Sequence, residues 1–170
     1  MVRKQILVGV GMLIAVAVLL LFASGRIVFA VALPLDDTAS RLAFAAKWLL
    51  VPGFALIAGI GMASGRRFFV EDAIDGSRLP ESRSLEINLR YNLNTLEQTV
   101  LALIAWPLLA LWLPADRLGL IPLLAVLFAA GRAAFWVGYL IAPWARAFGF
   151  ALTFYPTVAV YVWLAIRAFR

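Results

Sequence analysis

The chain has 170 residues and a net charge of +6, and 65% of the residues are hydrophobic while 14% are charged. This composition excludes a single water-soluble core and is typical of an integral membrane protein. The absence of cysteine and histidine excludes disulfides, thiol nucleophiles, imidazole bases and the usual zinc or haem ligands. The positive charge fits Lys and Arg that flank membrane spans, and no basic surface with interleaved aromatic residues points to nucleic acid as a partner.

The first apolar segment covers residues 6–23 and contains no charge. Its length is close to the roughly 20 residues that cross a hydrocarbon core of about 30 Å. A basic start followed by an apolar run also describes a signal peptide, but this run exceeds the usual apolar region of about 7 to 15 residues. We therefore expect residues 1–35 to form a retained transmembrane helix.

A second span is expected over residues 40–64, after a turn in which Asp37 or Thr38 can cap the helix. Pro52 lacks a backbone donor, so the Pro52-Gly53 pair should bend this helix. The span also carries a series of glycines that we interpret as close helix contacts rather than ligand contacts. The series is Gly53, Gly59, Gly61 and Gly65.

The long hydrophilic segment of the chain runs from Gly65 to Glu86. Its arginines place it in the cytoplasm, on the same side as Met1, because positive residues collect on that side of a membrane. One reading is a solvated connector. In the other, Arg66 and Arg67 fold back beside the next helix and help to hold an anion.

The third span, residues 85–113, begins with a polar stripe. On a helix that advances about 100° per residue, Arg90, Asn94 and Glu97 lie within roughly 60° of one another. Ionisable groups at membrane depth are costly, so three aligned polar groups are a candidate site. Alternatively, they pair with one another or with backbone carbonyls and join helices.

The fourth span, residues 118–142, carries Arg132, Phe135 and Tyr139 within an arc of about 60°. Arg146 would return to the same arc if the helix continued. An aromatic core stripe with one interfacial arginine is the plainer interpretation of this pattern.

Pro143 interrupts the fourth span, since it cannot bond to the carbonyl of Tyr139. A kink there could aim Arg146 into a cleft. A last span over residues 148–166 completes five membrane-spanning helices, and we expect a multi-pass protein of a bacterial inner membrane.

Two motifs taken together resemble the MAPEG family, the membrane-associated proteins of eicosanoid and glutathione metabolism. They are Arg90-x-x-x-Asn94-Thr95-x-Glu97-Gln98, and Arg132-x-x-Phe135-x-x-Gly138-Tyr139 followed by Arg146. The resemblance covers four helices and implies an all-α membrane protein, with a MAPEG-like four-helix domain over residues 36–170 behind one extra helix. It also implies a homotrimer in which glutathione, as co-substrate, binds between protomers near the cytoplasmic face.

The resemblance also implies roles for single residues. Arg90, Asn94 and Glu97 match the family's glutathione-binding set, and Tyr139 matches its binding tyrosine. Arg146 matches the arginine that activates the thiol. Arg66 or Arg67 matches a glutathione-contacting arginine of the first loop, and Arg132 matches a further basic position. Phe135 stands where several members have tyrosine, so one hydroxyl contact would be missing. No metal site is expected.

Residue chemistry is compatible with these roles. Glutathione carries two carboxylates and an ammonium group, which suit arginine forks and Glu97. A guanidinium near sulfur favours the thiolate, and Arg146 cannot act as a base at ordinary pH.

Three functions follow from these patterns. The first is a glutathione-dependent transferase or peroxidase acting on lipophilic substrates that arrive from the bilayer. The second is a non-catalytic, lipid-binding membrane protein of the same fold. The third, a small transporter with Arg90, Glu97 and Arg132 as pathway charges, is disfavoured because no inverted repeats are evident.

Overall fold

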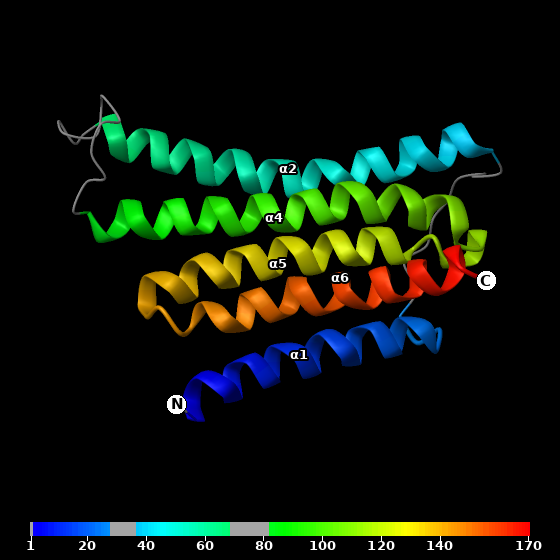
Figure 1. Ribbon diagram of the computed structural model, residues 1–170, viewed down its shortest axis with the longest axis horizontal. Coiled ribbons are helices and arrows are strands. Elements are labelled where there is room, and N and C mark those ends of the chain that lie inside the picture. The colour runs from blue at the N-terminus through cyan, green and yellow to red at the C-terminus, as the bar shows by residue number, and fades with distance from the viewer. Residues whose placement is uncertain (1, 28–36, 69–81) are drawn as a thin grey trace.

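The structure is a computed structural model that describes residues 2–27, 37–68 and 82–170. Within these ranges the chain forms five long helices and no strand (Figure 1). They are α1 (Val2–Ala23), α2 (Thr38–Phe68), α4 (Arg83–Trp112), α5 (Leu120–Ile141) and α6 (Arg146–Ala168), with a 3-10 turn, η1 (Ala115–Arg117), between α4 and α5. Each long helix has the length and apolar composition to cross a membrane, and the fourth span, Ala115–Ile141, includes η1 together with α5. The expected all-α membrane fold is confirmed.

The helices lie side by side and alternate in direction along the chain (Figure 1). Helices α1, α4 and α6 begin at one end of the molecule, which we call the N-terminal end, and α2 and α5 finish there. Helix α2 packs on α4 and α5 packs on α6, while α1 packs on the outside of α6. The predicted domain boundary at residue 35 and most of the predicted hydrophilic loop, residues 69–81, lie outside the described residues.

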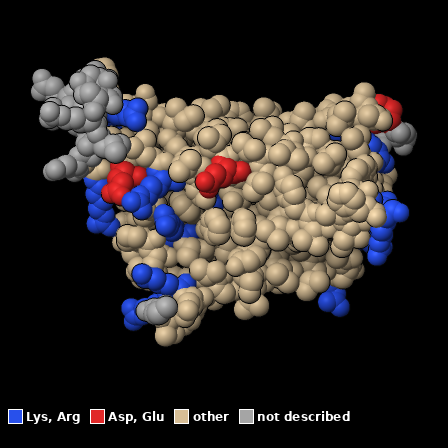
Figure 2. All heavy atoms as spheres, in the orientation of Figure 1, with Lys and Arg blue, Asp and Glu red and all other residues tan. Residues whose placement is uncertain are grey.

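Most charged side chains gather toward the two ends of the face seen in Figure 2; one acidic group lies nearer the middle, and the rest of the band between the ends is uncharged. This distribution is what a membrane-spanning bundle requires, because uncharged side chains face the hydrocarbon and Lys and Arg reach the headgroups.

Helix α2 starts where the sequence predicts a cap. The Asp37 carboxylate accepts hydrogen bonds from the Ser40 backbone N–H at 2.9 Å and from the Ser40 hydroxyl at 2.5 Å. These bonds lower the pKa of Asp37 below its ordinary value. The cap is therefore fully formed at neutral pH and is lost only when the pH falls through that lowered pKa.

Helix α2 is continuous through Pro52 and bends gently near its middle (Figure 1). Of the four glycines interpreted as close contacts, Gly59 packs against Tyr91 and Asn92 of α4. A Cβ at Gly53, Gly61 or Gly65 would meet nothing within 4 Å in the single chain.

The region after the fourth span corrects one expectation. Helix α5 ends at Ile141, Ala142 is extended with φ of −158° and ψ of 145°, and α6 begins at Arg146. The residue before proline avoids the helical region, so Pro143 ends the helix one residue earlier than predicted. Arg146 is therefore the first residue of α6 rather than a continuation of α5, and α6 starts two residues before the predicted position 148.

The core lies between α4, α5 and α6. Trp106 and Phe128 meet edge to face there, with ring centroids 6.4 Å apart, and Leu109 and Leu164 are buried beside them. Helices in a membrane associate through close packing rather than through a hydrophobic driving force, and small residues permit it. Gly149 of α6 lies against the backbone of α5, which fixes how these two helices present their side chains.

Candidate functional site

Arg90 and Tyr139 join α4 to α5 at the N-terminal end. Arg90 Nη1 donates to the Tyr139 hydroxyl at 3.3 Å, and Arg90 Nη2 forms an ion pair with Glu86 at 2.6 Å. The Arg90 side chain remains 56% exposed, so a ligand can reach it from outside the single chain. Sequence reasoning missed Glu86 as a partner, although its position four residues before Arg90 on a helix was the available signal.

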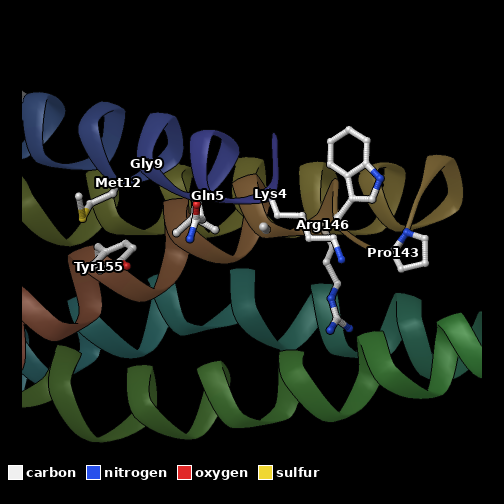
Figure 3. Close-up of a pocket in the computed structure, with 10 residues that line it drawn as sticks. Lys4, Gln5, Gly9, Met12, Pro143, Arg146 and Tyr155 are labelled. Atoms are coloured by element: carbon white, nitrogen blue, oxygen red, sulfur yellow. The ribbon is translucent and has the colours of Figure 1, made fainter. Parts of the chain in front are cut away.

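Arg146 lies on the same tyrosine from the α6 side. Its Cζ atom is 4.6 Å from the Tyr139 ring centroid and 5.9 Å from that of Phe135. The two rings meet edge to face at 5.9 Å. A cation over an aromatic face is held by the ring quadrupole. In Figure 3 the Arg146 side chain points away from α1 and into the bundle, so its charge is directed to the Arg90 and Tyr139 pair.

Arg132 is buried, with 1% of its surface exposed. Its Nη1 donates to Asn94 Oδ1 at 2.7 Å and its Nη2 to the Thr153 hydroxyl at 2.5 Å, while its Cζ lies 4.9 Å from the Phe135 ring centroid. In this arrangement the guanidinium holds Asn94 in place from within the bundle. Thr153 carried no signal in the sequence, because threonine in a helix commonly bonds only to its own backbone.

The polar chain continues outward from Arg132. Asn94 Nδ2 donates to Glu97 Oε2 at 3.2 Å, and Glu97 is exposed on α4. Hydrogen bonds therefore connect Thr153 of α6, through Arg132 and Asn94, to a carboxylate on the outer surface. The alternative that this stripe joins helices is correct for its inner part, where Arg132 of α5 binds Asn94 of α4, and Glu97 in the outer part is exposed.

The predicted site residues thus form two groups that meet at Phe135. One contains Arg90, Tyr139 and Arg146, and the other contains Arg132, Asn94 and Glu97. Arg66 and Arg67 close α2, and in the described part of the chain neither contacts these groups. Among the described residues no cluster of three or more His, Cys, Asp or Glu could hold a metal ion.

The fold and this arrangement define a multi-pass α-helical membrane protein with a cationic site at one end of a four-helix bundle. The family model described as the MAPEG family matches residues 42–166. The chain belongs to the MAPEG family, as the two motifs predicted. The matched range begins inside α2, so it does not include α1.

Two curated relatives are similar over most of this chain. Transmembrane protein 79 of Mus musculus is 30% identical over 129 residues, and Transmembrane protein 79 of Bos taurus is 29% identical over 129 residues. Each comparison covers 76% of this chain and 32% of the relative, so the chain spans about a third of their length. No solved structure gives a significant match. Both relatives are mammalian, so they do not support the expected location in a bacterial inner membrane. The prediction of an integral, multi-pass membrane protein is supported by the five apolar helices and the family match.

Proposed function

We propose that this protein is a glutathione-dependent enzyme of the membrane, which conjugates glutathione to lipophilic electrophiles or reduces lipid hydroperoxides with it. The observation that carries the proposal is the convergence of Arg90 and Arg146, from two helices, on the single phenol of Tyr139. Two cations fixed beside one another with unused donors favour an anionic ligand. Membership of the MAPEG family supports the same function.

The charges suit the ligand. The exposed guanidinium of Arg90 can bind one glutathione carboxylate, and the outer carboxylate of Glu97, oriented by Asn94, can bind the ammonium group. Arg66 or Arg67 could supply a donor to the second carboxylate. The guanidinium of Arg146 would stabilise the thiolate, whose proton passes to water because arginine is no base at ordinary pH.

The chemistry balances in either reaction. In conjugation the thiolate sulfur forms a bond to the electrophilic carbon of the acceptor while the bond from that carbon to a leaving group, or to the oxygen of an epoxide, breaks. The departing anion takes the bonding electron pair, and an opened epoxide then takes a proton from water. In hydroperoxide reduction two glutathione thiols supply two electrons, and the products are an alcohol, water and glutathione disulfide. We expect the lipophilic substrate to reach the site from the bilayer.

We also propose that copies of the chain cover the outer face of α4 in a homotrimer. Leu93, Leu96 and Val100 are 61%, 46% and 45% exposed, and they surround the exposed Glu97. A carboxylate in contact with lipid tails is costly. A neighbouring protomer on this face would remove Glu97 from lipid and complete the glutathione site.

Binding of glutathione tests the proposal. We expect millimolar glutathione to raise the thermal midpoint of the detergent-solubilised protein, since a ligand at about 100 times its Kd stabilises the folded state by about 2.7 kcal/mol. S-Methylglutathione, which keeps the carboxylates, should stabilise it similarly. Arg90→Ala should lose this effect, and Arg83→Ala, which removes an exposed arginine from the same end of α4, should keep it. A protein indifferent to both compounds at millimolar concentration contradicts the proposal.

A second candidate function is lipid binding without catalysis in the same fold. Two predicted glutathione contacts are weakened, which favours this function. Phe135 has no hydroxyl group, and the buried Arg132 guanidinium already donates hydrogen bonds to Asn94 and Thr153. This function would survive Arg146→Ala, whereas a glutathione-dependent reaction would not.

Arg132 provides a further prediction, as a positioning residue. Arg132→Met keeps a long side chain but leaves Asn94 without its charged donor, a bond worth about 1.5 to 3 kcal/mol. We expect the KM for glutathione to rise about 10-fold or more with kcat little changed, and Arg132→Lys to restore part of the affinity. Steady-state kinetics at saturating acceptor measure both constants. An equal loss in kcat and kcat/KM would instead place Arg132 in contact with the reacting atoms.

A further inference from the structure

A cavity of about 670 Å³ lies between α1 and α6 at the N-terminal end (Figure 3). It lies beside the face of α1 that packs on α6, where Ala15 and Phe22 are buried. At Gly11 a Cβ would lie 2.8 Å from the Phe148 carbonyl oxygen and 2.9 Å from the Ala151 Cβ, whereas at Gly9 it would meet nothing within 4 Å. Gly11 therefore lies on the face of α1 that packs on α6, and the face that carries Gly9 and Met12 borders the open space.

The walls of the cavity change from polar to apolar along its length. Lys4 and Gln5 line it at the end of α1, and Met12 lines it farther in, with Trp144 and Tyr155 of the opposite side facing them. Lys4 and Met12 are eight residues apart, about 12 Å along a helix. The cavity is thus a slot with a cation at the membrane surface and an apolar interior.

Lys4 is the cation available to a ligand in this slot. In the described part of the chain it has no ion pair, and no Asp or Glu lines the cavity. Arg146 contributes to the wall, but its guanidinium turns away from α1 onto the Tyr139 ring (Figure 3). A ligand here would meet one positive charge and no negative one, which does not suit the ammonium group of glutathione.

We propose that this cavity binds an anionic phospholipid of the surrounding membrane. Its phosphate lies at Lys4, and one acyl chain runs between α1 and α6 toward Met12. The volume is within the roughly 300 to 1,000 Å³ of small-molecule sites. Lys4 lies in the first turn of α1, at the end of a helix long enough to span a membrane, and tryptophan and lysine are side chains that favour the headgroup layer at such ends. The proposal concerns α1, which the family match does not include, and it does not depend on glutathione binding.

Quenching of Trp144 fluorescence tests it. The full chain is placed in phosphatidylcholine nanodiscs in which a lipid with brominated acyl chains, either phosphatidylglycerol or phosphatidylcholine, replaces part of the lipid in the same series of increasing fractions. The difference between wild type and Trp144→Phe isolates the signal of Trp144. We expect the quenching of Trp144 by brominated phosphatidylglycerol to require about a fivefold lower fraction than quenching by brominated phosphatidylcholine, as one lysine near an anionic headgroup would give.

Three variants define the site. Lys4→Gln should abolish the preference for phosphatidylglycerol, and Arg3→Gln, an equal charge change one residue away and outside the cavity lining, should retain it. Gly9→Leu, whose side chain has open space to enter, should fill the slot and reduce quenching by both lipids. Equal quenching by the two lipids in wild type, or an equal effect of Lys4→Gln and Arg3→Gln, would overturn the proposal. Stronger quenching by brominated oleate than by phosphatidylglycerol would overturn the choice of a phospholipid.

Discussion

Replacing Arg146 with Ala is expected to remove the thiolate absorbance of bound glutathione and to lower kcat by about 100- to 1,000-fold, the usual cost of deleting one group that stabilises a developing anion. The guanidinium rests on the faces of Tyr139 and Phe135. Ring faces keep no unpaired hydrogen-bond donor or acceptor after its removal, so the variant should still fold. Stopped-flow ultraviolet absorbance after mixing with glutathione measures the thiolate directly.

Arg167→Ala is the matched control for this experiment. Arg167 lies near the other end of α6, with its Cζ 5.8 Å from the Trp163 ring centroid. The Arg167→Ala variant therefore loses a cation–aromatic contact of the same helix but should leave the thiolate signal unchanged. A normal thiolate band in Arg146→Ala would assign activation to another cation. A folded wild-type protein without any thiolate band would favour the non-catalytic, lipid-binding function.

Helical spacing predicted which residues share a face but not which neighbours they meet. Arg90, Asn94 and Glu97 do lie on one side of α4, as expected. In the structure, however, Arg90 turns to Glu86 and Tyr139, while Asn94 bridges Arg132 and Glu97. Periodicity fixes an angle around one helix axis, and these partners depend on how α5 and α6 are placed beside it.

The proline rules predicted the break at Pro143 but not where the next helix begins. The interpretation of Arg132 as an interfacial or ligand-contacting arginine depended on the same missing information. Its buried guanidinium is held by hydrogen bonds to Asn94 of α4 and Thr153 of α6, both on other helices. Long-range packing of this kind leaves no trace in local composition, whereas apolar segments of membrane-crossing length with few charges predict the five spans directly.

The second large effect is expected at Gly149. A Cβ at this position would overlap the backbone N and Cα of Phe135 and the carbonyl oxygen of Gly131. All three are backbone atoms of α5, so no side-chain rotation can relieve the overlap and α5 and α6 must separate. We expect Gly149→Ala to lower the free energy of unfolding by about 3 kcal/mol, the upper range for overpacking, and the thermal midpoint by about 6 to 12 °C.

Gly61→Ala supplies the control, because a Cβ there meets nothing within 4 Å. Alanine is favoured over glycine in a helix by about 1 kcal/mol, so this variant should be neutral or slightly more stable. The contact at Gly149 also sets the distance between Arg132 and Thr153 and between Arg146 and Tyr139. Gly149→Ala should therefore weaken glutathione binding even below its thermal midpoint. Equal stability of the two variants would mean that α5 and α6 can shift apart at little cost, and that their close contact does not position the site.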